Sequence, residues 1–373
     1  MAARVVLAMS GGVDSSVAAY LLRQQGYEVI GLFMRTGAHD GEDARADHKK
    51  GCCSAVDAGD ARRVADRLDI PFYALDFEHD FSRIIDYFAD EYLRGRTPNP
   101  CVVCNNWLKF GKLWAYGKQL EADYIATGHY ARVVWRDGEP ELHRAADPDK
   151  DQSYVLYGLR RVLLPRLLFP IGDLHKEQVR ALAREAGLGV HDKPDSVEIC
   201  FVPDGDHAAL IRDRRPDAAT PGRIIDTAGK VLAHHDGIER FTVGQRKGLG
   251  FAAGQRRYVL QILPTTHDVV VGPREELFAS ELVASAVNWL CDPPAAPLPC
   301  RARIRYRHLG ADALVTVLPD GGARVEFAEP QSAITPGQAV VFYDGERVLG
   351  GGWIESTSEE LAVAAGERMA SGG

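Results

Sequence analysis

The chain has 373 residues, of which 46% are hydrophobic and 26% charged, and its formal net charge is −8. This length exceeds what one hydrophobic core usually supports, so two or three domains are expected. No apolar run is long enough to span a bilayer, the first residues do not resemble a signal peptide, and seven unevenly spaced cysteines argue against a disulfide framework. We therefore expect a cytoplasmic protein without membrane contact.

The first part of the chain is predicted to alternate between strands and helices. Strands are expected at residues 4–9, 28–34, 70–75 and 123–127, and helices at residues 15–25 and 57–68. This order predicts an α/β fold that begins with a doubly wound parallel sheet of the Rossmann-like kind.

The loop between the first strand and the first helix has the sequence SGGVDS, from Ser10 to Ser15. Its glycines let a phosphate approach the backbone, and its hydroxyls, together with that of Ser16, suit an anion at a helix N-terminus. Asp14 is expected to hold magnesium or to orient another group. A plain glycine turn with a serine cap is the alternative interpretation. The full motif favours nucleotide binding, and it resembles the PP-loop of N-type ATP pyrophosphatases, which split ATP between the α and β phosphates.

The fourth predicted strand ends in Gly128 and His129. Ligands of open parallel sheets bind beyond the carboxyl ends of the strands, so both residues are expected beside the SGGVDS loop. A purely structural role for His129 stays open.

Three cysteines stand out: Cys101 and Cys104 in the segment TPNPCVVCN, and Cys200 in DSVEICF. A structural zinc site usually needs a second CxxC pair, which the chain lacks. A thioredoxin-like pair and a sulfur transfer with one persulfide and one resolving thiol remain open. A buried, inert role suits the remaining four: Cys52, Cys53, Cys291 and Cys300.

After about residue 212, short β segments are broken by Gly and Pro, which predicts a small β-rich middle domain and a C-terminal β-barrel. The predicted domains are residues 1–212, 213–272 and 273–373. The last residues, 356–373, are small and polar and are expected to be disordered.

Basic residues gather in this half despite the negative net charge, and binding depends on where they lie. Read as one strand, residues 301–308 place Arg301, Arg303, Arg305 and Arg307 on one face. Such a row of charges suits a polyanion such as RNA, whereas acidic neighbours in a solvated barrel are the alternative. The basic loop GQRKGLG, residues 244–250, is a second candidate for phosphate contact.

Seven segments, taken together and in order, resemble the tRNA-specific 2-thiouridylase family, which installs sulfur at C2 of the wobble uridine. The segments are SGGVDSSVAAYLL, TPNPCVVCNNWLKF, ATGHYAR, KDQSYVLY, DSVEICFVPDGDH, FTVGQRKGLG and RIRYRH. The resemblance implies adenylation of the uridine O2, followed by sulfur transfer from a protein persulfide.

The resemblance also implies site residues. Cys104 matches the family's nucleophile, and Cys200 matches the cysteine that carries the persulfide. The matching ATP positions are Ala8, Met9, Ser10, Gly11, Gly12, Val13, Asp14, Ser15, Met34 and Gly128. The matching tRNA positions are His129, Lys150, Asp151, Gln152, Arg305, Tyr306 and Gln338.

One position departs from the family, since Cys101 stands where many members have aspartate. A thiol is a weaker acid than a carboxyl group, so Cys101 would replace an acid–base aspartate poorly at neutral pH. The substitution opens a second mechanism, in which Cys101, Cys104 and Cys200 hold a [4Fe-4S] cluster that binds sulfide.

The expected cofactors are ATP and Mg, and the expected partners are a tRNA with a wobble uridine, a persulfide sulfur donor (a cysteine desulfurase or a sulfur-relay protein) and a disulfide reductant. Two other functions stay open. A PP-loop synthetase or amidotransferase acting on a small acid would share the N-terminal half. A non-enzymatic metal or iron–sulfur carrier would explain the cysteines alone.

Overall fold

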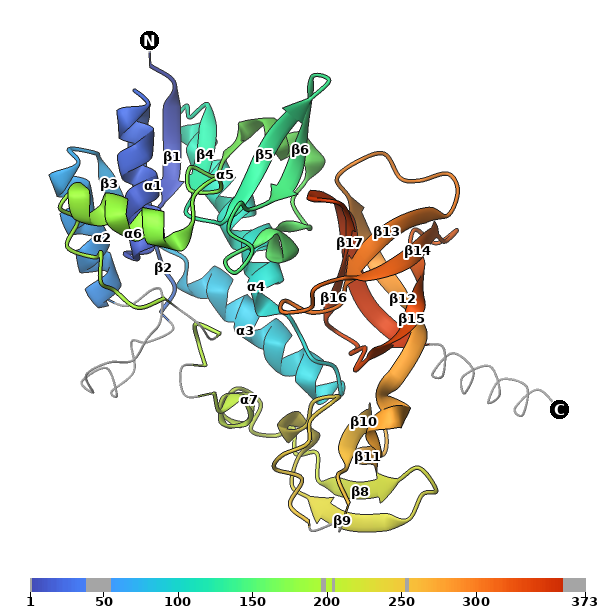
Figure 1. The fold of residues 1–373 in the computed structure, drawn as a ribbon. Coiled ribbons are helices and arrows are strands. Elements are labelled where there is room, and N and C mark those ends of the chain that lie inside the picture. The colour runs from blue at the N-terminus through green and yellow to red at the C-terminus, as the bar shows by residue number, and fades with distance from the viewer. Residues whose placement is uncertain (1, 38–54, 196–198, 203–204, 252–254, 358–373) are drawn as a thin grey trace. The chain divides into compact units, whose positions relative to one another are not determined.

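The computed structural model describes residues 2–37, 55–195, 199–202, 205–251 and 255–357 (Figure 1). The chain forms two compact units. The first contains residues 1–85, 100–205 and 346–348, and the second contains residues 86–99, 206–345 and 349–373. The division falls within the long helix α3 (Glu78–Leu93).

A parallel sheet forms the centre of the first unit, as predicted. Its strands are β1 (Arg4–Ala8), β2 (Glu28–Arg35), β3 (Phe72–Asp76), β4 (Tyr124–Thr127) and β7 (Leu167–Leu168). They are ordered β3-β2-β1-β4-β7, and every neighbouring pair is parallel. The chain leaves β1 toward β2 and later returns on the other side of β1 with β4. The topological switch point of the sheet therefore lies between β1 and β4.

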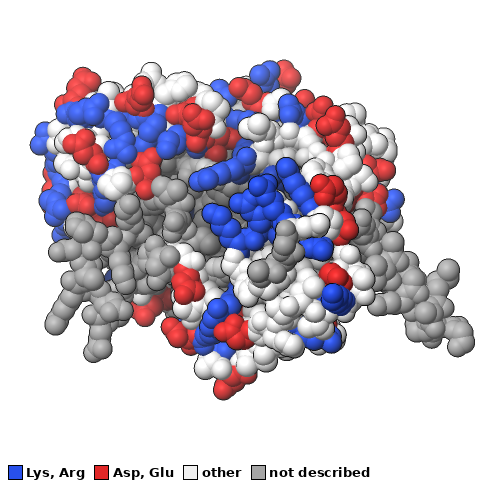
Figure 2. Space-filling model, turned by 60° about the horizontal axis from the view of Figure 1, so that its bottom comes forward, with Lys and Arg blue, Asp and Glu red and all other residues white. Residues whose placement is uncertain are grey.

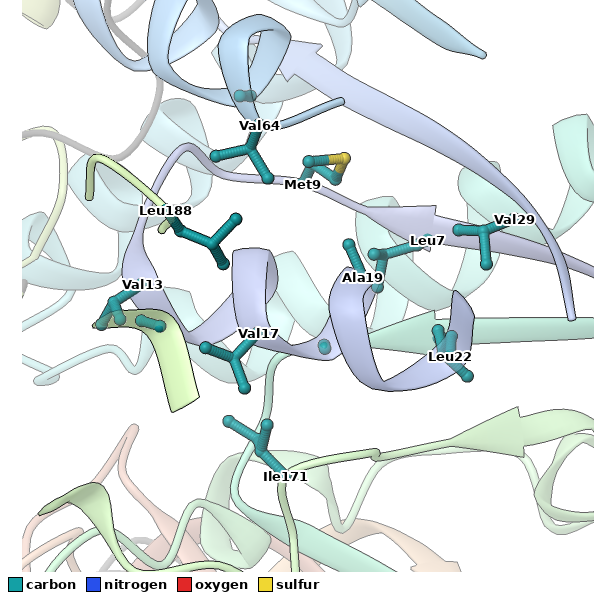
Figure 3. Packing of buried hydrophobic residues seen from close by; sticks show 14 of the residues in the cluster. Leu7, Met9, Val13, Val17, Ala19, Leu22, Val29, Val64, Ile171 and Leu188 are labelled. Carbon is teal, nitrogen blue, oxygen red and sulfur yellow. The ribbon is translucent and has the colours of Figure 1, made fainter. Parts of the chain in front are cut away.

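Three helices pack on this sheet through their apolar faces: α1 (Val13–Gln24), α2 (Ala55–Arg67) and α5 (Leu113–Gln119). Helix α6 (Lys176–Glu185) packs on α1. Figure 3 shows Ala19 of α1 beside Leu7 of β1, and Val17 of α1 near Ile171, within a cluster of buried residues. This core fixes the start of α1 against the carboxyl end of β1.

A single helical run carries the CxxC pair. It begins with α4 (Pro100–Val103), continues as the π-helix η2 (Cys104–Lys112) and ends with α5. Proline suits the first position of a helix because its missing N–H has no partner there. Nine residues of π-helix are unusual, since such turns are mostly single and often lie at functional sites.

The first unit also holds smaller elements. A hairpin of β5 (Ala131–Arg136) and β6 (Glu139–Arg144) turns at Asp137 and Gly138, which both have positive φ, as a two-residue type I′ turn requires. Two 3₁₀ helices follow, η3 (Ser153–Leu156) and η4 (Arg161–Arg166).

The second unit is rich in β structure, as predicted. After α7 (His207–Arg214) a four-stranded sheet has the order β10-β11-β8-β9. Its strands are β8 (Gly222–Asp226), β9 (Val231–His235), β10 (Tyr258–Leu263) and β11 (Asp268–Gly272), with the short helices η5 (Ile238–Arg240) and η6 (Arg274–Leu277) beside them.

Six further strands close into a barrel in the order β12-β15-β14-β13-β16-β17, with β17 paired to β12. They are β12 (Phe278–Trp289), β13 (Leu298–Arg303), β14 (Ala311–Val317), β15 (Ala323–Ser332), β16 (Ala339–Asp344) and β17 (Arg347–Thr357). Apolar side chains from all six strands form its core.

Two expectations about this unit are wrong. The arginine-rich segment is not one strand, because β13 ends at Arg303 and a turn follows in which the N–H of His308 bonds to Arg305 O. Arg303 is buried, whereas Arg305 and Tyr306 are exposed. The predicted disordered tail also starts too early. Ser356 and Thr357 are the end of β17 and pair with β12, while residues 358–373 lie outside the described part.

Candidate active site

The SGGVDS loop lies at the carboxyl end of β1. Ala8 pairs with Leu32 of β2 on one side and with Thr127 of β4 on the other, so Met34 and Gly128 follow on the two neighbouring strands. Helix α1 starts inside the motif, with Gly12 as its N-cap and no side-chain capping bond. The amides of the first turn are thus not covered by a capping side chain, and such amides bind anions.

Two glycines at this edge are required by close packing. Gly11 has φ +74°, and a Cβ there would overlap the carbonyl group of Asp57 in α2. A Cβ on Gly128 would lie 2.7 Å from the backbone nitrogen of Ser15. At Gly12 a Cβ would meet only Ser10 Oγ, at an ordinary 3.5 Å. The protein itself therefore needs Gly11 and Gly128, whereas a Cβ at Gly12 would make no close contact.

The serine hydroxyls of the motif bond to one another and to the loop backbone. Ser10 N donates to Ser15 Oγ at 3.2 Å, and the two hydroxyl oxygens lie 3.3 Å apart. Ser16 is fully buried and donates its hydroxyl to Gly12 O at 2.8 Å. Ser15 Oγ also donates to Gly12 O, at 3.2 Å. The hydroxyls of Ser15 and Ser16 therefore share this carbonyl partner.

Asp14 orients two neighbours, which is one of the two roles that the sequence suggested. Its carboxylate accepts hydrogen bonds from Lys176 Nζ at 2.8 and 2.9 Å and from the Tyr130 hydroxyl at 2.9 Å. Burial raises the pKa of Tyr130, and the charge of Asp14 raises it further. Tyr130 therefore stays a neutral donor.

Asp195 joins three cations. Lys176 Nζ, Lys150 Nζ and an Arg180 guanidinium nitrogen lie 2.8, 2.8 and 2.9 Å from its oxygens. Burial by itself would raise the pKa of Asp195, but the hydrogen bonds and charges of Lys150 and Lys176 outweigh it and lower the pKa to about 2. This carboxylate is ionised at neutral pH.

Lys193 fastens the loop to α2. Its ammonium donates to Gly11 O at 3.0 Å, to Asp57 at 2.6 Å and to Asp60 at 2.7 Å. Sequence reasoning missed Lys193, Asp195 and Lys176. The first two lie in HDKPDSVEIC just before Cys200 and could have been noticed there, whereas Lys176 carries no motif.

The tRNA positions expected in this unit mostly make contacts inside the protein. His129 is buried, its Nδ1 lies 2.7 Å from Thr127 Oγ1, and burial lowers its pKa well below the usual value, with Lys109 adding to the effect. Asp151 is buried and accepts from the backbone N–H of Ser153 at 3.1 Å.

The two residues on either side of Asp151 in the sequence, Lys150 and Gln152, also make contacts inside the protein. Gln152 accepts at 2.9 Å from the backbone N–H of Tyr130, and Lys150 pairs with Asp195. The KDQ segment thus positions residues around the SGGVDS loop.

The tRNA positions in the second unit differ from one another. Arg305 is exposed and donates to Ser332 O at 3.1 Å, and Tyr306 is 41% exposed. Gln338 donates from its amide to Thr97 O at 3.0 Å and to Pro98 O at 3.2 Å.

Lysines and arginines are not evenly mixed with acidic residues on the surface (Figure 2), so the net charge of the whole chain does not describe the charge of each surface region.

The three singled-out cysteines have different exposure. Cys101 is exposed in α4, Cys104 is half-buried at the start of η2, and Cys200 is half-buried. In the described part of the chain, no three His, Cys, Asp or Glu side chains are placed to hold a metal ion. We derive no step through an iron–sulfur cluster or through magnesium.

Two of the other four cysteines lie in the described part of the chain. Cys300 is buried, as expected, and burial raises its pKa to about 12. Cys291 is half-buried and its Sγ donates to Leu349 O at 3.5 Å. Cys52 and Cys53 lie outside the described residues.

The SGGVDS loop at the switch point of a parallel sheet, followed by two β-rich parts, is the arrangement of a multidomain enzyme of the PP-loop class. The chain is 49% identical to a tRNA-specific 2-thiouridylase MnmA from Rhodopirellula baltica, over 96% of this chain and 98% of the relative. It is also 49% identical to one from Clostridium perfringens, over 95% and 98%. The chain therefore belongs to the tRNA-specific 2-thiouridylase family, a family of tRNA sulfurtransferases.

Family models match three consecutive parts. They are a tRNA methyl transferase HUP domain at residues 3–204, a tRNA methyl transferase PRC-barrel domain at 210–273 and an aminomethyltransferase beta-barrel domain at 279–354. The match through both β-rich parts favours the thiouridylase prediction over a small-acid synthetase. Among the described helices, none has the length and apolar character needed to cross a membrane.

Proposed function

We propose that this protein uses ATP to replace O2 of the wobble uridine of tRNA with sulfur. The observation that carries the proposal is the SGGVDS loop, where α1 begins without a side-chain cap at the switch point of the parallel sheet. Similarity over nearly the full length to relatives named tRNA-specific 2-thiouridylases supports tRNA as the substrate. The proposed domains are residues 1–212, 213–272 and 273–373.

In the first step, the uridine O2 attacks the α phosphorus of ATP. The bond from that phosphorus to the bridging oxygen breaks, and its electron pair leaves with pyrophosphate. The first-turn amides of α1 and the hydroxyls of Ser10 and Ser15 bind phosphate oxygens, where charge grows on the leaving group. Met34 and Gly128 follow on β2 and β4 and are assigned to the adenine side.

In the second step, sulfur displaces AMP. The terminal sulfur of a Cys200 persulfide attacks C2, and AMP leaves with the C2–O electron pair. The Cys104 thiolate then attacks Cys200 Sγ, which forms a Cys104–Cys200 disulfide and leaves the transferred sulfur on C2. A persulfide donor must reload Cys200, and a thiol reductant must reduce the disulfide in each cycle. Cys101 lies one helical turn before Cys104 and is assigned as an auxiliary thiol.

Recognition of tRNA is assigned to both units. Arg305 and Tyr306 are exposed and can meet RNA directly, by phosphate contact and by stacking. The assigned contacts at His129, Lys150, Asp151, Gln152 and Gln338 rest on the family's motif positions. The wobble base must leave its stack to reach the loop.

The test is ATP-dependent transfer of labelled sulfur from a persulfide donor to unmodified tRNA, followed by nucleoside analysis. The expected product is 2-thiouridine at the wobble position, with one pyrophosphate released per sulfur. A tRNA with cytidine at that position is the control and should receive no label. Absence of label in the uridine tRNA, with ATP and donor present, would overturn the proposal.

The sulfur relay needs its own variants. Cys104→Ser and Cys200→Ser should each abolish thiolation but retain tRNA-dependent pyrophosphate release, because adenylation precedes sulfur transfer. Cys291→Ser is the matched control and should remain active. Thiolation by both serine variants would contradict the relay while leaving the overall reaction in place.

A further inference from the structure

Lys176 places an ammonium group at the first turn of α1 from a distant part of the sequence. It is the first residue of α6, and its backbone N–H donates to Asp147 at 2.9 Å. Its Nζ contacts both carboxylate oxygens of Asp14, which lies 162 positions away in the sequence. The side chain is 11% exposed, and Nζ lies 5.8 Å from the centre of the Tyr130 ring. The packing therefore holds this cation at the loop.

Lys193 shows what a purely structural lysine looks like at the same loop. Its three hydrogen bonds go to a loop carbonyl and to two carboxylates of α2. Moving Lys193 to a ligand would break the bond that holds Gly11 and would leave Asp57, which is buried, without this cation. Lys193 is therefore fixed in place.

Lys176 differs because its partners have other cationic or donor contacts. Asp195 keeps Lys150 and Arg180 when Lys176 moves away. Asp14 keeps the Tyr130 hydroxyl and is 31% exposed, so water can also reach it. A lysine on a flexible stem between two such carboxylates can exchange them for a stronger anion at low cost.

We propose that Lys176 is a direct ligand of the β and γ phosphates of ATP and stabilises the pyrophosphate leaving group. The ammonium exchanges its bonds to Asp14 and Asp195 for phosphate oxygens when ATP binds at the first turn of α1. Asp14 is then the positioning residue that holds Lys176 in the ATP-free enzyme. The inference rests on the ATP use proposed above and adds a residue that no motif of the chain marks.

The test compares binding of two probes by calorimetry, α,β-methylene-ATP and AMP, to the full-length protein. Lys176→Met keeps the aliphatic stem against Tyr130 and removes the charge. It should weaken binding of the triphosphate analogue about 10- to 100-fold, as expected for loss of a charged hydrogen bond, and leave AMP binding unchanged. Lys176→Arg should restore much of the loss.

Arg184→Met is the matched control, because Arg184 is an exposed cation on the same helix, and it should change neither affinity. Equal losses for AMP and for the analogue would show a structural role and overturn the inference, as would unchanged binding of the analogue. These results are separable from the proposed function. A wild-type protein that binds the analogue but does not thiolate tRNA would refute the function alone.

Discussion

Lys193 Nζ donates a hydrogen bond to the carbonyl oxygen of Gly11 at 3.0 Å, across 182 positions of sequence. The bond orients the Gly11 peptide in the SGGVDS loop. It also brings the segment before Cys200 against the SGGVDS loop, within one compact unit. The loop geometry thus depends on a residue outside the motif.

Replacing Lys193 with methionine should destabilise the protein and weaken ATP binding. The change leaves the buried carboxylate of Asp57 without this cation. The free energy of unfolding should fall by about 1–3 kcal/mol in urea denaturation. Lys112→Met is the control, since Lys112 pairs with Asp80 on an exposed surface and should cost less than about 1 kcal/mol. Equal effects of the two variants would contradict the structural role of Lys193.

Replacing Gly11 with alanine should be more harmful than the same change at another glycine with positive φ. Gly229 has φ +80° with open space around its Cβ position, so Gly229→Ala should cost only the backbone term, about 1–2 kcal/mol. Gly11→Ala adds overlap with the Asp57 carbonyl and should cost roughly a further 1–3 kcal/mol. Thermal unfolding of the two variants measures the difference. Equal melting temperatures would show that α2 shifts away from the added Cβ without lowering the free energy of unfolding.

The ionised state of Asp195 predicts a pH dependence of stability. Its folded pKa of about 2 lies below the unfolded value of about 4, so its stabilisation is present above pH 4 and is lost as the pH falls toward 2. Asp195→Asn should therefore be less stable than the wild type at neutral pH by about 1–2 kcal/mol, since the carboxylate is partly exposed.

Guanidinium unfolding at several pH values tests this prediction. The difference between the variant and the wild type should stay constant down to about pH 4 and shrink at lower pH. Asp192→Asn, which changes an exposed carboxylate in the same segment, is the control and should show little difference at neutral pH. A gap between Asp195→Asn and the wild type that does not change with pH would contradict the assignment.

The alternation of strands and helices, the loop and its glycines could be predicted because each depends on neighbours in sequence. Periodicity gave β1, α1 and β2 to within one or two residues. The pairing of Asp14 with Lys176 could not be predicted, since local patterns say nothing about which distant side chain reaches a loop. The Gly12 carbonyl that the hydroxyls of Ser15 and Ser16 share is likewise not revealed by the motif.

The arginine segment shows how tertiary structure overrides alternation. A period of two holds through Arg303, but β13 ends there and the chain turns so that His308 closes on Arg305. Arg303 lies over the Tyr343 ring, 5.7 Å from its centre, and is buried. Only part of the expected basic face therefore meets solvent.

This difference gives opposite predictions for two neighbouring arginines. Arg303→Ala removes a buried guanidinium and its contact with Tyr343, so it should lower the free energy of unfolding by about 1–3 kcal/mol. Arg305→Ala changes an exposed residue and should alter stability by no more than about 0.5 kcal/mol.

In filter binding across a range of salt concentrations, Arg305→Ala should weaken tRNA binding and reduce the slope of log affinity against log salt by about 1. Asp312→Asn, a change at an exposed neighbour, should not reduce that slope. If Arg305→Ala left the slope unchanged, phosphate contact at this turn would be refuted, because a released counterion must appear in the salt dependence.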